Sequence, residues 1–439
     1  MKVLKFGGTS VGSAQRMKEV AKLITDGEQK IVVLSAMSGT TNTLVEISDY
    51  LYKKNPEGAN EIINKLEAKY KQHIDELFAT QEYKQKGLEV VKSHFDYIRS
   101  YTKDLFTLFE EKVVLAQGEL ISTAMVNFYL QECGVKSVLL PALEFMRTDK
   151  NAEPDPVYIK DKLRAQLDLY PDTEIYITQG FICRNAYGEI DNLQRGGSDY
   201  TASLIGAAVN ASEIQIWTDI DGMHNNDPRI VDKTAPVRQL HFEEAAELAY
   251  FGAKILHPTC IQPAKYANIP VRLLNTMDPE APGTLISNDT EKGKIKAVAA
   301  KDNITAIKIK SSRMLLAHGF LRKVFEIFES YQTSIDMICT SEVGVSVTID
   351  NTKHLNEILD DLKKYGTVTV DKEMCIICVV GDLEWENVGF EAKALDAMRD
   401  IPVRMISFGG SNYNISFLIR EWDKKVALQS LSDMLFNGK

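Results

Sequence analysis

Short apolar runs alternate with longer amphipathic stretches through the first half of the chain. Five runs have the length and composition of strands, at residues 3–6, 31–35, 137–140, 174–178 and 213–218. The stretches between them carry apolar residues at helical spacing, and this alternation is typical of parallel strands joined by helices. The pattern predicts an α/β domain with a mainly parallel sheet.

One long charged stretch, residues 43–112, interrupts this alternation. It carries apolar residues at helical spacing, such as Ile62, Ile63, Leu66, Tyr70, Ile74 and Leu77. We interpret it as a helical segment outside the sheet, forming a lid or an interface. Two prolines and a glycine at 278–283 cannot continue a helix or a central strand, and they predict a domain boundary.

An internal repeat follows that boundary. Gly319 begins a helical run, then strand-like runs at 334–338 and 343–349 and a helix at 353–365. The pattern recurs about 70 residues later from Gly389, with runs at 403–406 and 413–419 and a helix at 423–435. Each unit has the ferredoxin-like pattern. We therefore expect domains at 1–290, 296–370 and 371–439, and the strand near 304–309 could complete a module elsewhere in the sequence.

Composition excludes some classes of protein. Lys and Arg number 51 against 61 Asp and Glu, a net charge of −10, which disfavours binding to the phosphate backbone of nucleic acid. The sequence contains no run of about 18 apolar residues, so it predicts no membrane span. Six dispersed cysteines and an N-terminus without a long apolar leader region predict a cytoplasmic protein with reduced thiols.

Cys375 and Cys378 form a CxxC pair. They lie in an apolar run at 374–380, and no second pair or nearby histidine completes a four-ligand zinc site. We favour a buried core strand over metal or redox chemistry.

A glycine pair follows the first predicted strand directly, in KFGGTS at residues 5–10. Gly7 and Gly8 leave room for backbone amides to meet a phosphate, although neither the P-loop nor the GxGxxG spacing is present and a plain tight turn would look the same. Lys5 favours an anion site, because a lysine in an apolar strand is costly to bury without an anionic partner. It could also extend its ammonium to solvent from the end of the strand.

A second glycine pair lies in RGGSD at 195–199, before a helical run of small residues. Free amides and the positive end of a helix dipole at such an N-terminus suit an anion. Arg195 could bind a carboxylate through two parallel hydrogen bonds, and Asp199 could orient a cation such as Lys5. Equally, Ser198 or Asp199 could cap the helix beside a surface arginine.

Polar, turn-forming residues follow the strand that ends near Ile216, in WTDIDGMHNNDPR at 217–229. Ligands bind at the C-terminal edge of open α/β sheets, so we expect this segment to contact one. Its aspartates suggest a calcium loop, but the closing glutamate of an EF-hand is missing. Lys254, in GAKILHP at 252–258, could contact the same ligand or serve as a favourable charge at a helix end.

In their joint order these strings resemble the aspartate kinases of the amino-acid kinase family, specifically the lysine-sensitive, single-activity form with two ACT domains. The resemblance also rests on VLSA at 33–36, QGE at 117–119, QGF at 179–181 and the C-terminal repeat, and it covers essentially the whole chain. It implies an amino-acid kinase three-layer fold with a mainly parallel sheet, followed by two ferredoxin-like α+β ACT domains.

The resemblance implies transfer of the ATP γ-phosphoryl group to the β-carboxylate of L-aspartate, the first step of lysine, threonine and methionine biosynthesis. Magnesium should accompany ATP, bound through phosphates and water rather than in a protein cage. The matched catalytic residues are Lys5, Gly7, Gly8 and Asp199. The matched aspartate-binding residues are Ser35, Thr41, Glu119, Phe181, Arg195 and Ser198. The matched nucleotide-binding residues are Thr218, Asp219, His224, Asp227, Arg229 and Lys254.

Two of these assignments have a specific reason. Asp199 is expected to orient Lys5 rather than to remove a proton, because the aspartate carboxylate is already a nucleophile at neutral pH. His224 stands where we would expect a stacking tyrosine in many relatives, and imidazole can stack as well.

The resemblance also implies feedback control by a small amino acid, with L-lysine as the expected effector. The matched effector residues are Met314, His318, Gly319, Phe320, Leu321, Ile335, Asp336, Thr340, Ser341 and Glu342. Some of them would serve equally as core, turn and cap residues, and the string AHG at 317–319 lacks the arginine expected beside the effector. ACT modules pair through their edge strands, which predicts a homodimer or a dimer of dimers.

Two other functions compete with this one. Another amino-acid kinase would act on glutamate, acetylglutamate or a nucleotide, but Glu119 with Arg195 and the ACT repeat argue against it. A non-catalytic amino-acid sensor would be free to lose Lys5, Asp199 and Lys254, all of which are present.

Overall fold

The computed structural model describes residues 1–103, 105–193, 196–252, 256–311 and 318–437. The chain forms two compact units. The first comprises Met1–Met223, Arg238–Phe242 and Ile255–Asn288, and the second comprises His224–Val237, Glu243–Lys254 and Asp289–Lys439. Two segments that precede residue 290 therefore belong to the second unit.

The first unit is built on an eight-stranded sheet in the order β3-β4-β2-β1-β7-β9-β10-β8. Its strands are β1 (Lys2–Phe6), β2 (Lys30–Leu34), β3 (Ser137–Leu140), β4 (Ile175–Gln179), β7 (Ile214–Thr218), β8 (Gln239–His241), β9 (Val271–Asn275) and β10 (Thr284–Ser287). The five strands predicted from the sequence are β1, β2, β3, β4 and β7, and all five run parallel. The prediction of a mainly parallel sheet is confirmed.

Burial of the central strands shows that this sheet is covered on both faces. Every residue of β2 and β4 is buried, and so are four of the five residues of β1. Side chains alternate between the two faces of a strand, so complete burial requires a layer on each side. Helices form these layers: α1 (Ala14–Ile24), α5 (Leu108–Glu132), α6 (Pro156–Asp168), α7 (Gly197–Val209) and α9 (Gln262–Tyr266). A small hairpin of β5 (Ile182–Arg184) and β6 (Ile190–Asn192) follows β4.

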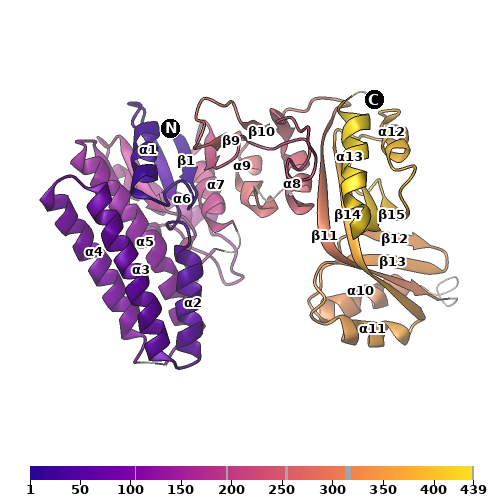
Figure 1. Cartoon of the computed structure of the whole chain (residues 1–439), viewed down its shortest axis with the longest axis horizontal. Helices are drawn as coiled ribbons and strands as arrows, with labels where there is room; N and C mark the ends of the chain where they lie inside the picture. Colours follow the sequence, from indigo (N-terminus) through magenta and orange to yellow (C-terminus); the bar gives the residue numbers. More distant parts are fainter. Residues whose placement is uncertain (104, 194–195, 253–255, 312–317, 438–439) are drawn as a thin grey trace. The chain divides into compact units, whose positions relative to one another are not determined.

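The stretch 43–112 forms helices outside the sheet, as predicted. α2 (Thr40–Tyr52), α3 (Pro56–Leu77), α4 (Gln81–Ser100) and α5 run side by side (Figure 1). The apolar stripe of α3 is buried in the same hydrophobic cluster as β1 and β2. The segment that we interpreted as a lid or an interface is therefore packed into the core of the unit.

Helix α5 is an exception to the prediction that no apolar run is long enough for a membrane span. Among the described helices it is the one with the length and apolar composition for a span, and 72% of that window is buried inside the protein. Its apolar residues pack against neighbouring helices and the sheet. A core helix of a globular protein has the same composition.

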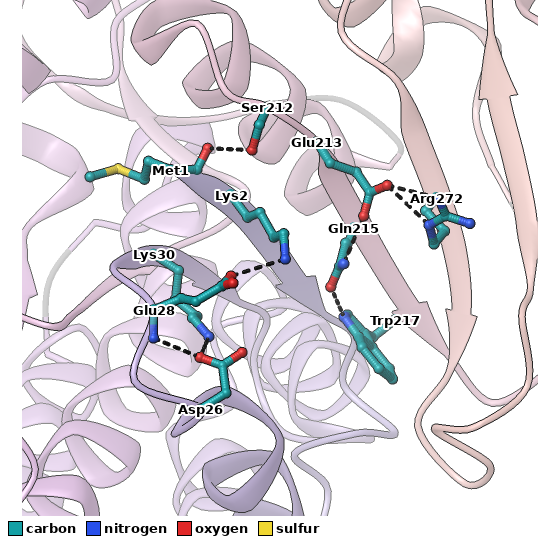
Figure 2. Close-up of polar contacts among 10 residues, drawn as sticks. All are labelled: Met1, Lys2, Asp26, Glu28, Lys30, Ser212, Glu213, Gln215, Trp217 and Arg272. Atoms are coloured by element: carbon teal, nitrogen blue, oxygen red, sulfur yellow. Dashed lines mark hydrogen bonds and ion pairs between the residues drawn. The ribbon is translucent and has the colours of Figure 1, made fainter.

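Ion pairs and hydrogen bonds tie together the amino ends of the central strands (Figure 2). Lys2 on β1 binds Glu28 at 2.9 Å, and Glu213, just before β7, binds Arg272 on β9 at 3.0 Å. The buried ammonium of Lys30 on β2 binds Asp26. These contacts hold neighbouring strands at one edge of the sheet and leave the carboxyl edge for ligands.

The proline and glycine stretch 278–283 is not a domain boundary. It forms the turn between β9 and β10, which pair antiparallel within the first sheet. The chain passes into the second unit after Asn288. Gly283 has φ +64°, a left-handed backbone that suits a hairpin turn.

The second unit contains a six-stranded antiparallel sheet in the order β12-β13-β11-β14-β16-β15. Its strands are β11 (Ile295–Lys310), β12 (Ile338–Ser341), β13 (Gly344–Ile349), β14 (Thr367–Gly381), β15 (Val403–Ser407) and β16 (Asn414–Arg420). Its helices are α8 (Phe242–Tyr250), whose first residue belongs to the first unit, α10 (Phe320–Ser330), α11 (Leu355–Lys363), α12 (Phe390–Ala397) and α13 (Lys424–Leu435). The predicted repeat is present, except that the strand expected at 334–338 begins only at Ile338.

Each of the two long strands contributes to both halves of this sheet. The part of β11 near Thr305–Lys310 pairs with β13 and with the start of β14. The earlier part of β11, near Ala297–Lys301, pairs with the second half of β14. The segment that completes the C-terminal half is therefore 295–301 rather than the predicted 304–309.

The CxxC pair lies within β14, as predicted for a core strand. Cys375 and Cys378 are fully buried, and burial raises the pKa of both thiols. Residues three apart on a strand point to opposite faces, so the two sulfurs cannot bind one ion. All six cysteines are free, as the sequence predicted.

Candidate active site

A cavity of about 370 Å³ lies in the first unit at the carboxyl ends of the parallel strands. The chain turns here after β1, β2 and β4, and β1 lies between β2 and β7, where the strand order changes direction. Such a point is the usual ligand site of an open α/β sheet. The lining residues are Lys5, Gly8, Ser35, Ala36, Met37, Ser38, Gly39, Thr41, Asn42, Glu119, Phe181, Gly196, Gly197, Ser198 and Asp199.

A nearly buried ion pair lies in this cavity. The Lys5 ammonium on β1 is 2.7 Å from Oδ1 of Asp199 in the first turn of α7, and the two side chains are 11% and 12% exposed. Asp199 is the anionic partner that a lysine buried in an apolar strand requires. A side chain at Gly7 would come within 3.5 Å of the Lys5 nitrogen, so the absence of one keeps the ammonium accessible.

Two helices begin at the cavity with glycine as the capping residue. α7 follows Gly196 at φ +74°, α2 follows Gly39 at φ +82°, and neither start has a side-chain cap within the described part of the chain. The first amides of a helix have no intrahelical partner and carry partial positive charge. Both helix starts therefore favour anionic ligands.

The start of α7 is held from behind by the 3₁₀ turn Pro258–Ile261. The Cys260 thiol donates to the Gly196 carbonyl at 3.3 Å. A side chain at Gly196 would lie 2.7 Å from the Cys260 sulfur and 3.0 Å from the side chain of His257. Glycine at 196 is thus needed both for the backbone conformation and for this close packing.

Glu119 on α5 is a second acidic residue in the cavity, besides Asp199. One of its oxygens accepts from the Ala36 amide at 3.3 Å, and the other is buried without a hydrogen-bond partner among the described residues. Burial raises the pKa of this carboxyl to about 8. A buried carboxylate with a vacant oxygen is suited to a cationic ligand group.

The loop after β2 is packed tightly against α5 and α3. A side chain at Gly118 would lie 2.8 Å from Ala36, and the Ser122 hydroxyl donates to the Ser35 carbonyl at 2.8 Å. The hydroxyl of Tyr70, on α3, is 3.0 Å from that of Thr40. α5, together with Tyr70 of the segment 43–112, therefore supports the chain between β2 and α2 at the cavity.

Hydroxyl groups and a strained residue complete the cavity. The Ser35 hydroxyl donates to Ser198 at 3.0 Å. Phe181 has φ +69°, a conformation that costs a non-glycine residue energy, and its amide donates to Thr201 of α7 at 3.1 Å. A side chain at Gly180 would lie 2.5 Å from the Ser198 hydroxyl, which explains the glycine there.

The predicted nucleotide-binding residues are divided between the units. Thr218 and Asp219 follow β7 in the first unit, and the Thr218 hydroxyl accepts from the Ile220 amide at 3.3 Å. In the second unit, Arg229 binds Asp227 through two hydrogen bonds of 2.9 and 2.7 Å, which holds the pKa of Asp227 below its usual range. His224 contacts the Thr234 hydroxyl at 3.0 Å.

Three predicted site residues, Arg195, Lys254 and Met314, lie outside the described residues. The remaining effector residues occupy two regions of the second unit. His318, Gly319, Phe320 and Leu321 lie at the start of α10, and Phe320 belongs to the core of that half. Ile335 and Asp336 precede β12, which contains Thr340 and Ser341, and Glu342 follows it.

Comparison with known proteins identifies the family. Residues 1–275 match the amino acid kinase family, and residues 377–435 match an ACT domain. Aspartokinase 1, chloroplastic, of Arabidopsis thaliana is 36% identical over 99% of this chain and 80% of its own length. Lysine-sensitive aspartokinase 3 of Escherichia coli is 32% identical over 99% of each chain. The chain belongs to the aspartokinases of the amino acid kinase family.

Solved aspartokinase structures share this fold over the whole chain. E. coli aspartokinase III in complex with aspartate and ADP (R-state) matches with a TM-score of 0.85 at 32% identity, covering 99% of this chain and all of that one. The same enzyme in complex with lysine and aspartate (T-state) matches with a TM-score of 0.82 over 99% of each chain. The aspartokinase fold is thus confirmed for the kinase and ACT regions together.

Some residues that shape the cavity were not among the sequence predictions. Ser38 and Gly39 line it, and the small polar run SGTT at 38–41 after a strand is a loop signal that could have suggested them. Tyr70 and Cys260 act through tertiary contacts and have no local signal. No group of three or more His, Cys, Asp or Glu that could hold a metal occurs among the described residues.

Proposed function

We propose that this aspartokinase transfers the γ-phosphoryl group of ATP to the β-carboxylate of L-aspartate and yields 4-phospho-L-aspartate, the first step of lysine, threonine and methionine biosynthesis. The observation that carries this proposal is the pairing of Lys5 with Asp199 in a cavity that also holds the buried carboxyl of Glu119. The cavity thus offers positive groups for phosphate and carboxylate and one negative group for an amine. The structure of a relative, E. coli aspartokinase III, is a complex with aspartate and ADP.

The aspartate substrate has three charged groups to be placed. Glu119 binds the α-ammonium through its vacant oxygen, and Arg195 binds the α-carboxylate, for which a planar guanidinium is well matched. The remaining contacts come from Ser35, Thr41, Phe181 and Ser198, which line the same cavity. This arrangement leaves the β-carboxylate free to attack phosphorus.

The phosphoryl group transfers directly, without a covalent enzyme intermediate. Charge in the transition state spreads over the equatorial oxygens, so the site needs cations and N–H donors. Lys5 and the amides of Gly7 and Gly8 supply them. Asp199 orients the Lys5 ammonium, and no general base is needed because the attacking carboxylate is already ionised.

Nucleotide binding is assigned to Thr218, Asp219, His224, Asp227, Arg229 and Lys254. The Arg229 side chain is 77% exposed, and Asp227 already orients its guanidinium. Arg229 therefore loses little side-chain entropy when it binds a phosphate. Mg²⁺ accompanies ATP and supplies charge neutralisation on the phosphates. We expect the ion to be held mainly by phosphates and water.

The second unit is proposed to regulate the enzyme. We assign 1–290 to the catalytic domain and 296–370 and 371–439 to ACT domains, with L-lysine as the feedback inhibitor at the effector residues named above. The terminal strand β12, most of whose residues are exposed, supports assembly into a homodimer or a dimer of dimers. Six free cysteines support a cytoplasmic location. Light scattering on the purified chain measures the assembly.

An ADP-release assay with a panel of acceptors tests the reaction. We expect turnover with L-aspartate and Mg-ATP, and at least a hundredfold lower kcat/KM with glutamate, acetylglutamate or a nucleoside monophosphate. A hydroxamate assay on the product distinguishes an acyl phosphate from simple ATP hydrolysis. ATP hydrolysis without acyl phosphate, or preference for another acceptor, would refute the proposal.

A further inference from the structure

The carboxylate of Asp336 is the centre of a polar cluster in the second unit. Its side chain is 1% exposed. Oδ1 accepts from the Lys301 ammonium at 2.7 Å and from the Tyr250 hydroxyl at 2.8 Å. Oδ2 is buried and has no hydrogen-bond partner within the described part of the chain. Oδ1 thus accepts two hydrogen bonds, and Oδ2 is available to a further donor.

Lys301, on β11, is itself held in place by several contacts. Its nitrogen lies 3.0 Å from Oδ2 of Asp350 and 4.4 Å from the centre of the Tyr250 ring. Burial raises the pKa of Asp336, while Lys301 and the Tyr250 hydroxyl lower it. Without these two donors a buried carboxyl would tend to take up a proton and lose its attraction for a cation.

Tyr250 brings a part of the kinase sequence into this cluster. It is the last residue of α8, inside the range 1–275 that matches the amino acid kinase family. Two residues later, Gly252 has φ +122°, and a side chain there would lie 2.2 Å from the Ala300 carbonyl. The end of α8 is therefore fixed to the strand that carries Lys301, at a backbone approach that only glycine allows.

The internal repeat contains the same ion pair with its charges exchanged. Arg404 occupies the place of Asp336, 68 residues later, and Asp371 occupies that of Lys301, 70 residues later. The Arg404 Nε donates to Asp371 at 3.0 Å. A ligand amine would meet a carboxylate in the first module and a guanidinium in the second, so this position distinguishes the two modules.

We propose that Lys301 and Tyr250 are positioning residues for an amine ligand of the first module, fixing the Asp336 carboxylate so that Oδ2 accepts from the ligand's ammonium. The inference rests on the proposed control by an amino-acid effector. A buried carboxylate oxygen without a donor is best satisfied by a charged N–H group. Tyr250 then connects effector binding to α8.

Calorimetric titration of the full-length protein with L-lysine tests this role. We expect Tyr250→Phe to raise the Kd about tenfold, since hydrogen bonds to charged groups contribute most. Lys301→Met should raise it more than tenfold, and Lys301→Arg should stay within about threefold of wild type because it keeps the charge. The matched control is Arg404→Met, which removes the repeat-related pair and should leave the Kd unchanged. Without L-lysine, Tyr250→Phe should keep the wild-type kcat and aspartate KM.

The outcomes separate this inference from the proposed reaction. A wild-type or tighter Kd in Tyr250→Phe, a variant that keeps the ring and its packing, would overturn the positioning role and leave the reaction standing. A wild-type protein that does not bind L-lysine would overturn effector control and this inference together. Calorimetry needs no turnover, so a protein that binds L-lysine but does not phosphorylate aspartate would overturn the proposed reaction alone.

Discussion

The Lys5 ammonium and Oδ1 of Asp199 lie 2.7 Å apart, on a strand and a helix that are nearly 200 residues apart in the sequence. Neither side chain is more than 12% exposed, so each depends on the other for charge balance. If Lys5 stabilises the transferring phosphoryl group, Lys5→Met should lower kcat by about 10²–10³-fold, the usual cost of losing such a donor. Asp199→Asn should lower kcat less, by about tenfold to a hundredfold, because it misplaces the ammonium without removing it. ADP release measures both.

Folding must be monitored in these two variants, because unpairing a buried charge destabilises a protein. Circular dichroism and the Tm provide the check. Since the double variant Lys5→Met/Asp199→Asn leaves no unpaired charge, it should regain Tm relative to Lys5→Met alone while kcat stays low. A double variant with wild-type turnover would contradict the catalytic assignment.

Glu119 should give the aspartate KM a pH dependence. Burial raises the pKa of its carboxyl to about 8, so at pH 7 the free enzyme holds it mostly protonated. Binding of the substrate ammonium requires the ionised form. The aspartate KM should therefore fall as pH rises from about 6 to 8, and Glu119→Gln should raise the KM and remove this dependence. A KM in wild type that is flat over this range would contradict the role of Glu119.

The same group should affect stability in the absence of substrate. The folded state holds the Glu119 proton up to about pH 8, whereas an unfolded chain releases it near its ordinary pKa of about 4.3. Its stabilising contribution is complete below that lower value and is lost as pH rises through about 8. The Tm of the substrate-free enzyme should fall over this interval more than that of Glu119→Gln, and saturating aspartate should reduce the difference. Thermal unfolding across a pH series measures it.

Adjacent glycines should differ in their tolerance of a methyl group. At Gly8 a side chain would lie 2.9 Å from the Ala36 carbonyl, a backbone atom of the loop that lines the cavity. At Gly7 it would meet the end of Lys5 at 3.5 Å and the Trp217 carbonyl at 4.0 Å, both ordinary van der Waals distances. Gly8→Ala should therefore cost about 1–3 kcal/mol of folding free energy, whereas Gly7→Ala should cost less than about 0.5 kcal/mol. Denaturant titration compares them, and equal losses would contradict the packing argument.

Arg229 should act on nucleotide binding alone. It is 77% exposed, so its ion pair with Asp227 contributes little to stability. Arg229→Ala should raise the ATP KM about tenfold, with an unchanged aspartate KM and Tm. Arg322, 76% exposed and paired with Glu326 on α10, is a matched control whose alanine variant should leave both KM values unchanged. An unchanged ATP KM in Arg229→Ala would remove Arg229 from the nucleotide site.

The sequence predicted the parallel core correctly. Each of the five predicted strands lies within a residue of its position, because apolar runs buried on both faces have a strong local signal. Lys5 lies near the carboxyl end of β1, and Glu119 of α5 with Ser198 and Asp199 of α7 line the same cavity.

Long-range pairing could not be predicted in the same way. The stretch 278–283 has the composition of a linker, yet β9 and β10 pair across it, since a tight turn and a domain boundary use the same residues. The partners of Asp336 come from positions 250 and 301, which no local pattern connects. The support of Thr40 by Tyr70 likewise depends on helix packing.

Because β11 belongs to both halves of the second sheet, the two halves cannot be completed at the same time during synthesis. Ala299 pairs with Cys378, so one half of the second sheet must wait for a segment made 79 residues later. Until then 295–301 is an apolar edge without its partner on a nascent chain, the kind of surface that associates wrongly with other chains. The cavity-bearing unit ends at Asn288 and has by then been synthesised, so the sheet of the second unit is completed after the catalytic part of the chain has been made.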